Sequence, residues 1–211
     1  MFIAIEGVIG VGKTSLARLL QPSLNANLLL EVFEENPFLS NFYQDRKRYA
    51  FQTQMFFLLS RYHQQRRGVP GLLASDRPLI SDYTFDKDAL FAKINLSGDE
   101  LEMYYVVHKA LAEKIPVPDL TIYLSASIDI VMQRIAMRDR SYERAIERDY
   151  IETLIDAYDS RFLNINDERE VLVLDTNELD FVHQPQDLQW VDNRIRQALQ
   201  LPPFQPGLPL K

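Results

Sequence analysis

The run from Gly7 to Thr14 has the residue types and spacing of a phosphate-binding loop. Its glycines, among them Gly7 and Gly12, let the chain curl so that backbone amides point at phosphate oxygens. Lys13 supplies a positive charge for the outer phosphates of ATP, and Thr14 supplies a hydroxyl that can coordinate Mg²⁺. We therefore predict that ATP and Mg²⁺ bind here and that Lys13 takes part in catalysis. The residues expected to contact ATP in this segment are Gly7, Val8, Ile9, Gly10, Val11, Gly12, Lys13, Thr14 and Ser15.

Acidic and basic side chains follow two apolar runs further along the chain. Leu28–Leu30 is followed by Glu31, and Leu72–Ala74 is followed, after one serine, by Asp76 and Arg77. If both runs are strands of a parallel sheet, these side chains lie with the phosphate loop at the carboxyl edge, where such sheets bind ligands. Glu31 could then act as a general base on a bound hydroxyl. Arg77 could orient that carboxylate and neutralise charge on a moving phosphoryl group.

Glu34 and Glu35 are rivals of Glu31 for the role of base. They precede Asn36-Pro37, a pair typical of a helix N-cap followed by proline in the first helical position. The helix dipole alone explains acidic residues at such a place. Glu31 is therefore the better candidate, against the alternative that it is only a solvated charge at a strand end.

Three arginines lie close together later in the chain. Arg134 and Arg138 share one face of an expected helix, and Arg140 falls at its end. The simpler interpretation is a solvated basic turn. In a chain of net charge −7 that also has a phosphate loop, we favour a lid that closes over the triphosphate.

The composition excludes several classes of function. The chain has no cysteine, so disulfides and thiolate metal sites are ruled out, and its three histidines are scattered. The charge of −7 makes a nucleic-acid polymer a poor partner. No apolar run approaches the length of a membrane span, and the N-terminus does not resemble a signal peptide. We therefore expect a cytoplasmic protein with neither a membrane nor a nucleic acid as partner.

Apolar runs alternate with segments of helical spacing, which predicts an α/β fold with a parallel sheet covered on both faces. The chain should form a single domain over residues 1–200, followed by a proline-rich tail, 201–211, that is extended or disordered. The expected strands are Phe2–Ile5, Leu28–Leu30, Leu72–Ala74, Leu120–Leu124 and Val171–Leu174. The expected helices are Thr14–Leu20, Phe38–Arg67 with a break near Tyr49, Asp82–Ile94, Gly98–Ile115, Ile128–Met137, Arg148–Ile165 and Asp187–Leu199.

From Ile3 to about Phe181 the chain resembles the deoxyribonucleoside kinases, and most of all the bacterial deoxyadenosine and deoxyguanosine kinases. The motifs that carry the resemblance occur in the family's order: Ile5-Glu6-Gly7 before the loop, Glu31, Phe51-Gln52-Thr53-Gln54 through Ser60-Arg61, Asp76-Arg77, Asp82, the arginine lid and Asp175-Thr176-Asn177. The resemblance implies a P-loop kinase fold, a five-stranded parallel sheet with helices on both faces and an arginine-rich lid.

The resemblance also implies roles for individual residues. Glu31 would be the catalytic base for the 5′-hydroxyl, Arg77 would hold it and the phosphates, and Asp76 with Thr14 would hold Mg²⁺. The implied substrate contacts are Tyr43 and Glu143 to the sugar 3′-hydroxyl, Gln54 to the base, the Arg61–Asp82 ion pair in the base pocket, and Phe85 against the base. Arg134 and Phe181 would flank the adenine of ATP, and Arg138 and Arg140 would complete the lid.

The sequence departs from the family pattern at Val32, where proline is common, at Pro78, where a small hydroxyl residue is usual, and at Asp139, where the lid has glycine. These departures leave the activity in place but bear on substrate preference. The resemblance implies ATP-dependent phosphorylation of the 5′-hydroxyl of a deoxyribonucleoside, in nucleotide salvage, by a homodimer formed through its long helices. Arg61 and Asp82 favour a purine deoxynucleoside or deoxycytidine over thymidine, because thymine lacks an exocyclic amino group.

Two other functions remain open at this point. A nucleoside monophosphate kinase of the thymidylate kinase type shares the sheet, the phosphate loop and an Asp-Arg motif. It would need extra cations for the acceptor phosphate and would have less use for Glu31. A nucleotide-dependent switch or binding module would need a water-positioning residue and loops that sense the γ-phosphate, and no stretch of the sequence compels that interpretation.

Overall fold

Five parallel strands form the centre of the molecule. The computed structural model describes residues 1–163 and 170–203, so Asn164 and Ile165 of the last-but-one expected helix and most of the tail lie outside the described residues. Every strand pairing is parallel, in the order β2-β3-β1-β4-β5. The strands are β1 (Phe2–Glu6), β2 (Asn27–Leu29), β3 (Leu79–Ser81), β4 (Leu120–Ser125) and β5 (Val171–Asp175). The prediction of an α/β fold with a five-stranded parallel sheet is confirmed.

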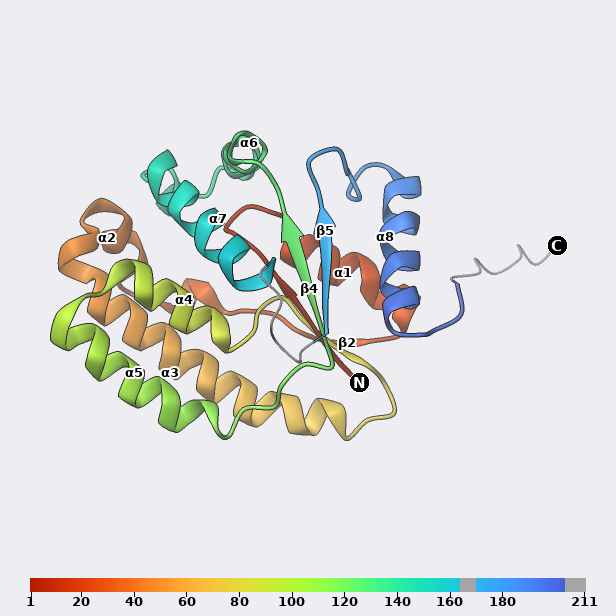
Figure 1. Ribbon diagram of the computed structural model, residues 1–211, viewed down its shortest axis with the longest axis horizontal. Helices are drawn as coiled ribbons and strands as arrows, with labels where there is room; N and C mark the ends of the chain where they lie inside the picture. The colour runs from red at the N-terminus through yellow and green to blue at the C-terminus, as the bar shows by residue number, and fades with distance from the viewer. Residues whose placement is uncertain (164–169, 204–211) are drawn as a thin grey trace.

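Helices cover both faces of this sheet. Figure 1 shows α1 and α8 on one side, and α3, α4, α5 and α7 on the other. The helices are α1 (Lys13–Leu24), α2 (Leu39–Gln44), α3 (Arg46–Leu73), α4 (Asp86–Asn95), α5 (Gly98–Ala112), α6 (Ile128–Arg138), α7 (Arg148–Phe162) and α8 (Pro185–Ala198), with short 3₁₀ turns at Phe33–Glu35 and Ser141–Glu143. Because both faces are covered, β1 is buried at all five positions and reads as a continuous apolar run up to Glu6.

The third strand differs from the prediction. Leu72 and Leu73 are the last residues of α3, and the strand is formed by Leu79–Ser81 instead. Gly68, Pro70 and Gly71 have low helix propensity and therefore suggested that the helix ends near Arg67.

Tertiary packing explains why the helix continues past these residues. Val69 is fully buried, and it packs with Phe2, Leu29 and Leu79 in a small apolar cluster under the sheet. The apolar area buried there holds the last turns of α3 together despite their poor propensity.

The break in the long helical segment also lies earlier than expected. Asp45, rather than Tyr49, separates α2 from α3, and its carboxylate accepts a hydrogen bond from the backbone amide of Arg48 at 3.2 Å. This N-cap fixes the start of α3. It therefore sets the direction in which α3 carries Gln54 and Arg61 along the sheet.

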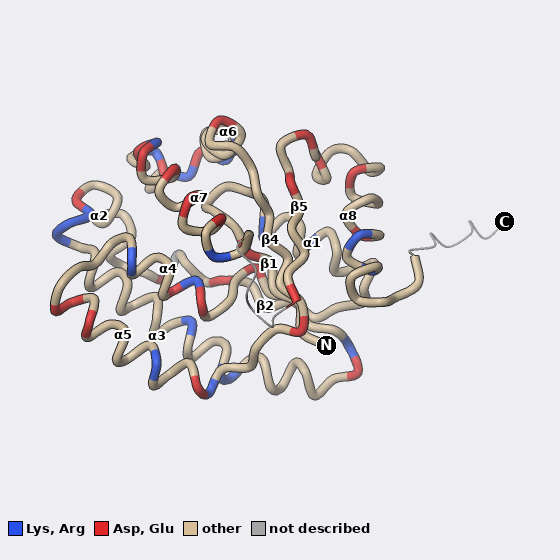
Figure 2. The backbone as a smooth tube through the Cα atoms, in the orientation of Figure 1, with Lys and Arg blue, Asp and Glu red and all other residues tan. Residues whose placement is uncertain are grey.

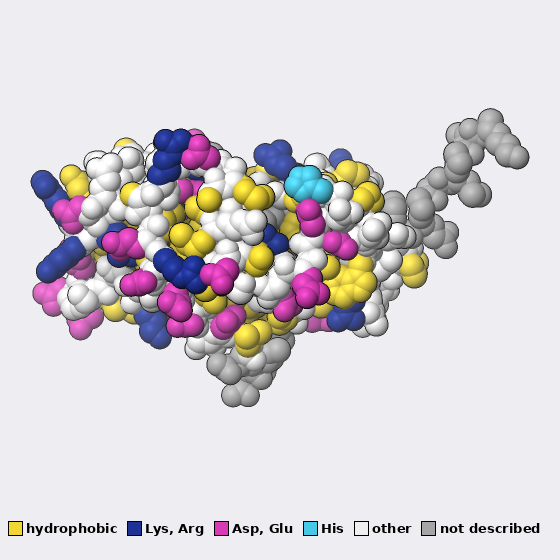
Figure 3. Space-filling model, turned by 90° about the horizontal axis from the view of Figure 1, so that it is seen from above, with side chains coloured by type: hydrophobic (Ala, Val, Ile, Leu, Met, Phe, Trp, Pro, Cys, Tyr) yellow, Lys and Arg dark blue, Asp and Glu magenta, His cyan; other side chains and the backbone are white. Residues whose placement is uncertain are grey.

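The carboxyl ends of the strands meet at the upper edge of the molecule in Figure 1. Figure 3 looks down on this edge, where basic and acidic side chains lie among hydrophobic ones. Along the backbone as well, positive and negative residues are interspersed (Figure 2). Within residues 1–163 and 170–203, no helix combines the length and the apolar character that crossing a membrane would require.

Candidate active site

The phosphate loop connects β1 to α1 at the carboxyl edge of the sheet. Gly7 and Gly12 have φ angles of 146° and 113°, in the region that residues with a side chain rarely adopt. A Cβ atom on Gly7 would lie 2.6 Å from the carbonyl oxygen of Leu124 in β4. Both the backbone conformation and the lack of space therefore require glycine at this position, so that the loop can pass close to the sheet and then open into α1.

The ammonium group of Lys13 folds back over the loop. Nζ donates hydrogen bonds to the carbonyl oxygens of Gly7 at 2.7 Å and Val8 at 3.0 Å. Burial, followed by the nearby charge of Lys87, lowers the pKa of Lys13 to about 8. Two ammonium groups thus lie near one another in a water-poor part of the site, which suits a ligand with several negative charges.

Asp82 follows β3 and joins the first turn of α1 to Glu31, two residues after β2. Its carboxylate accepts a hydrogen bond from the hydroxyl of Thr14 through one oxygen, and from the backbone amide of Glu31 through the other, at 2.8 Å. The side chain is 3% exposed. Asp82 therefore lies beside the phosphate loop rather than in an ion pair with Arg61, which corrects the sequence-based prediction.

Thr14 and Asp82 fit a magnesium ion by their chemistry. Mg²⁺ prefers oxygen ligands, and it commonly takes one or two from the protein and the rest from water and substrate phosphates. The described residues contain no cluster of three or more His, Cys, Asp or Glu side chains that could hold a metal without such help. A hydroxyl and a carboxylate next to the phosphate loop are consistent with this mode of binding.

Glu31 lies between two cations. Its Oε1 accepts hydrogen bonds from Nε of Arg61 at 2.9 Å and from a terminal nitrogen of the same guanidinium, while Oε2 accepts one from Nζ of Lys87 at 2.7 Å. Arg61 is itself paired with buried Asp88. Burial raises the pKa of Glu31, but the charges of Arg61 and Lys87 outweigh that effect and hold the pKa well below the usual carboxyl range. Glu31 is therefore an ionised carboxylate in the free protein.

A pocket of about 100 Å³ joins the phosphate loop to Glu31 and to α3. Most of the predicted site residues are brought together by its walls. Those that line it are Ile9, Gly10, Lys13, Thr14, Glu31, Tyr43, Gln54, Arg61, Asp82, Arg138, Arg140 and Glu143. The other residues that line the pocket are Phe33, Leu39, Phe57, Lys87, Phe91 and Tyr142.

The α3 side of the pocket carries a polar atom that has no partner among the described residues. Gln54 is 2% exposed, and its Oε1 atom accepts no hydrogen bond from any described residue. The guanidinium of Arg61 lies 4.5 Å from the ring centre of Phe57, one helical turn away. A buried amide oxygen without a donor costs free energy unless a ligand supplies one. This wall therefore suits a flat polar molecule.

The lid segment begins at the end of α6. A terminal nitrogen of Arg138 donates to both carboxylate oxygens of Glu143, at 2.6 and 2.7 Å. A terminal nitrogen of Arg140 lies 3.6 Å from Oε1 of the same carboxylate. Asp139 has a φ of 47°, a left-handed conformation that glycine adopts easily and that turns the chain at this point. The two arginines thus reach the pocket from above while Glu143 holds them.

Arg134 and Phe181 flank the phosphate loop from outside the pocket. Arg134 donates to the carbonyl oxygen of Val11 at 3.2 Å and to Thr176 at 2.9 and 2.7 Å. The ring of Phe181 is so close to Gly12 that a Cβ there would lie 3.0 Å from it. Arg134 is therefore tied to the loop and to the residue after β5, apart from the pair of lid arginines.

Asp76 and Arg77 lie at the opposite edge of the sheet. Both are exposed and both precede β3, where the parallel strands begin. Nε of Arg77 donates to the carbonyl oxygen of Asn25, just before β2, at 2.9 Å. The prediction that these residues end the third strand is wrong, because the strand lies after them rather than before them. The structure therefore separates them from Glu31 and from the phosphate loop.

Phe85 is also placed differently from the prediction. It is 5% exposed and stacks on His108 of α5, with ring centres 4.9 Å apart, and it does not line the pocket. Phe91 of α4 lines the pocket instead.

Sequence reasoning missed Lys87 and Asp88. The sequence pattern places both in a helix that begins at Asp82, where charges near a helix start are common. Their burial, at 8% and 0% exposure, distinguishes them, and it follows only from the way α4 packs on α3.

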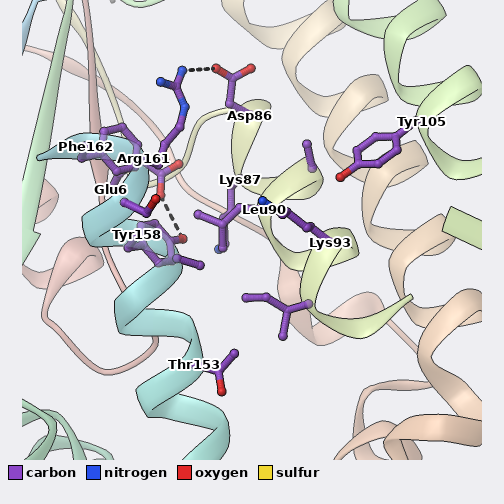
Figure 4. A pocket seen from close by; sticks show the side chains of 14 residues that line it. Glu6, Asp86, Lys87, Leu90, Lys93, Tyr105, Thr153, Tyr158, Arg161 and Phe162 are labelled. Carbon is purple, nitrogen blue, oxygen red and sulfur yellow. Dashed lines mark hydrogen bonds and ion pairs between the residues drawn. The ribbon is translucent and has the colours of Figure 1, made fainter. Parts of the chain in front are cut away.

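A second and larger cavity, of about 660 Å³, opens between α4 and α7. Figure 4 shows Glu6 and Tyr158 at one side of it, with Lys87 and Lys93 projecting from α4. Tyr158 donates to Glu6 at 3.2 Å, and burial raises the pKa of Glu6. This cavity does not include the phosphate loop or Glu31. The smaller pocket is therefore the better candidate for the reaction.

The chain is similar to known deoxynucleoside kinases in sequence and in structure. The family model described as deoxynucleoside kinase matches residues 3–200. A deoxyguanosine kinase of Bacillus subtilis is 35% identical over 201 residues, covering 94% of this chain and 97% of the relative. A deoxyadenosine kinase of Dictyostelium discoideum is 34% identical, covering 90% and 77%. The solved deoxyadenosine kinase of M. mycoides with bound dATP superposes with a TM-score of 0.80 at 26% identity, covering 93% of this chain and 99% of that structure.

Proposed function

The chain belongs to the deoxynucleoside kinase family, and from this premise we propose that it transfers the γ-phosphoryl group of ATP to the 5′-hydroxyl of a purine deoxynucleoside or deoxycytidine. The products are the 5′-monophosphate and ADP. The observation that carries the proposal is a single pocket in which Lys13 and Thr14 of the phosphate loop face Glu31. A phosphate site and a carboxylate base in one pocket are what phosphoryl transfer to a hydroxyl needs.

Glu31 is the general base. The 5′-hydroxyl is a weak nucleophile, and a carboxylate within hydrogen-bond reach can accept its proton as the phosphoryl group moves. Lys13 stabilises charge on the outer phosphates, and Arg138 and Arg140 approach from the lid to exclude water. Arg134 and Phe181 lie beside the loop, where they can flank the adenine of ATP.

Thr14 and Asp82 hold Mg²⁺ in this proposal. When bound, the ion neutralises charge on the phosphates of ATP and orients them. Asp82 takes the part that the sequence analysis gave to Asp76. The short chain of contacts from Thr14 through Asp82 to the amide of Glu31 keeps the hydroxyl and the carboxylate oriented toward the loop.

The nucleoside occupies the α3 side of the pocket. Gln54, with its free Oε1, can accept a hydrogen bond from a base amino group or ring N–H, and Arg61 can donate to a ring nitrogen. Asp88 replaces Asp82 as the partner of Arg61 and also has an oxygen without a partner among the described residues. Tyr43 and Glu143 line the pocket between this wall and the lid, where they can contact the sugar 3′-hydroxyl.

A nucleobase with both hydrogen-bond donors and acceptors pairs best with the polar groups of Gln54, Arg61 and Asp88. Adenine, guanine and cytosine each carry an exocyclic amino group, and thymine does not. A site with buried polar atoms rejects a ligand that leaves one of them unpaired. We therefore favour deoxyadenosine or deoxyguanosine, with deoxycytidine next and thymidine last.

Residues 1–200 form one kinase domain and 201–211 a tail, which agrees with the family match to residues 3–200. We place the enzyme in the cytoplasm, where ATP is supplied, and in nucleotide salvage, because its substrate is a preformed nucleoside.

It forms a homodimer through its long helices, and α5 exposes Met103 and Val106, at 59% and 71%, for such a contact. Light scattering of the purified protein measures the mass that tests this last point.

The activity is tested with a panel of acceptors. Purified protein is incubated with ATP and MgCl₂ and, in separate reactions, with each of the four deoxynucleosides, with dTMP, and with no acceptor. We expect the highest kcat/KM with a purine deoxynucleoside. The highest kcat/KM with dTMP would favour the monophosphate kinase alternative. ATP hydrolysis at the same rate in every reaction would favour the nucleotide switch.

A further inference from the structure

The predicted catalytic arginine, Arg77, does not line the pocket, and the cations near the base come from other elements. Arg77 is exposed at the opposite edge of the sheet and bonded to the carbonyl oxygen of Asn25. The cations that line the pocket are Lys13, Arg61, Lys87, Arg138 and Arg140. They come from the phosphate loop, α3, α4 and the lid.

Most of these cations are already paired with carboxylates. Arg61 is held between Glu31 and Asp88 by at least three hydrogen bonds, and moving it would leave buried Asp88 uncompensated. Arg138 and Arg140 both contact Glu143 in the lid. In the free protein these three guanidiniums are therefore already paired with carboxylates.

Lys87 is held differently. Its Nζ donates to Oε2 of Glu31 at 2.7 Å, and its side chain is 7% exposed. Glu31 keeps a second cation, Arg61, on its other oxygen if Lys87 leaves. A lysine carries its charge on a flexible four-carbon stem and can exchange one anionic partner for another without moving its helix.

Lys87 is also close to the phosphates that ATP would place on the loop. Its charge acts on both Lys13 and Glu6, the residues at the two ends of the phosphate loop. It lines the same pocket as Lys13 and Thr14, from the first turn of α4. An ammonium group that contacts the base and lines the same pocket as the phosphate loop can reach both.

We propose that Lys87 is a catalytic residue that passes from Glu31 to the transferring phosphoryl group, in the role that the sequence assigned to Arg77. The inference rests on the proposed kinase function. The bond between the 5′-oxygen and the γ-phosphorus forms, and the bond from that phosphorus to the bridging oxygen of ADP breaks. The hydroxyl proton passes to Oε2 of Glu31, the oxygen that Lys87 releases. Lys87 keeps its proton and stabilises the charge on the γ-phosphoryl oxygens.

The exchange links the arrival of ATP to activation of the base. Without ATP, Lys87 neutralises Glu31 and keeps a buried carboxylate paired. With ATP, the phosphoryl oxygens compete for the ammonium group, and Glu31 is left with Arg61 on one oxygen and a free oxygen for the hydroxyl. The base therefore becomes available only when ATP is bound.

The test compares three single variants with the wild type. Lys87→Met keeps the length of the side chain but removes its charge, Lys87→Arg keeps the charge, and Lys93→Met is the matched control. Lys93 lies on the same helix but lines only the cavity between α4 and α7. Circular dichroism and thermal melting establish that each variant is folded, and kcat and KM for the preferred deoxynucleoside are measured at saturating ATP and Mg²⁺.

We expect Lys87→Met to lower kcat about 10²-fold or more, the scale of losing one donor to the transition state. KM for the nucleoside should change by less than about 5-fold, because Arg61 and Gln54 still bind the base. Lys87→Arg should recover at least about 10-fold of the lost kcat because its charge can reach the same oxygens. Lys93→Met should keep the wild-type kcat.

Four outcomes overturn the assignment. If Lys87→Met has wild-type kcat, or if its loss falls on KM alone, Lys87 acts only on binding or structure. If Lys87→Met does not fold, the comparison of Lys87→Arg with wild type decides, and a folded Lys87→Arg without activity contradicts a role based on charge. A wild-type protein that phosphorylates no deoxynucleoside overturns the proposed function as well, whereas an active wild type confines the failure to Lys87.

Discussion

The hydroxyl of Thr14 donates a hydrogen bond to the carboxylate of Asp82, a residue 68 positions further along the chain. The contact joins the first turn of α1 to the residue that follows β3. It brings two oxygen groups together beside the phosphate loop, and through the amide of Glu31 it also reaches the proposed base. The proposed magnesium site and the proposed base are thus parts of one hydrogen-bonded unit.

Replacing Asp82 by Asn should raise the concentration of Mg²⁺ needed for half-maximal activity. The amide keeps the shape of the side chain but loses the charge that attracts the ion. We expect a shift of about 10-fold or more, the scale seen when groups that support a metal site are lost. The measurement is the rate as a function of free Mg²⁺ at fixed ATP. Asp99→Asn, exposed on α5, is the control, and an unchanged Mg²⁺ dependence in Asp82→Asn speaks against this role.

Replacing Glu31 by Gln should lower kcat by about 10²- to 10⁴-fold, the usual contribution of general base catalysis. The loss should fall on kcat rather than on KM for the nucleoside, because the proton moves only near the transition state. Steady-state kinetics with the preferred nucleoside measure both constants.

Glu35→Gln serves as the control for Glu31→Gln, since Glu35 is exposed at the end of a 3₁₀ turn. The side chain of Glu34, the other rival, lies outside what the structure describes. A larger loss at Glu35 than at Glu31 would move the base to Glu35. A wild-type kcat in Glu31→Gln would show that positioning and charge stabilisation carry the reaction.

The pH dependence of kcat/KM for ATP, which reports the protein before ATP binds, should lack an acid limb from Glu31. Burial raises the pKa of Glu31, but Arg61 and Lys87 hold it well below the usual range, so the carboxylate stays ionised as pH falls. The wild-type profile should therefore be flat, as far as the base is concerned, from about pH 8 to about pH 5.

Arg61→Met removes one of these two cations while the burial of Glu31 remains. The pKa of Glu31 should then rise, and an acid limb should appear at a higher pH than in the wild type. Each profile is scaled to its own plateau, so that weaker nucleoside binding in Arg61→Met does not affect the comparison. Identical profiles for the two proteins would contradict the effect of Arg61 on Glu31.

Replacing Arg138 by Ala should lower kcat while leaving KM for the nucleoside nearly unchanged. Arg138 reaches the pocket from the lid and can stabilise charge on the phosphates, a contribution on the scale of about 10²-fold for one main electrostatic contact. Arg144→Ala is the matched control, because Arg144 belongs to the same segment but is exposed and pairs with Asp139 at 2.7 Å. If Arg138→Ala instead loses nucleoside binding and keeps turnover, Arg138 serves Glu143 and the sugar rather than the phosphates.

Local patterns in the sequence were sufficient for much of the fold and part of the site. The phosphate loop was predictable because its geometry depends on consecutive residues, namely glycines that accept positive φ angles followed by Lys13 and Thr14. The strands β1, β2, β4 and β5 were predictable because buried parallel strands are short apolar runs. Glu31 followed from these two facts, since it comes soon after a strand and all parallel strands end at one edge.

The tertiary structure decided what depends on packing between distant segments. The sequence around Gly68 and Pro70 argues against helix, and only the burial of Val69 against β1, β2 and β3 keeps α3 helical to Leu73. That extension moves the third strand to Leu79–Ser81. Arg77 therefore lies at the edge where the parallel strands begin, away from the phosphate loop and Glu31.

The position of β3 also determines which charged residues reach the site. Once β3 ends at Ser81, Asp82 meets Thr14, and the first turn of α4 carries Lys87 to Glu31. In the sequence, Lys87 looks like any charged residue near a helix start, because neither its burial nor its partner has a local signature. Which cation faces the base is a property of how α4 packs against α3 and the sheet, and the chain order alone does not contain it.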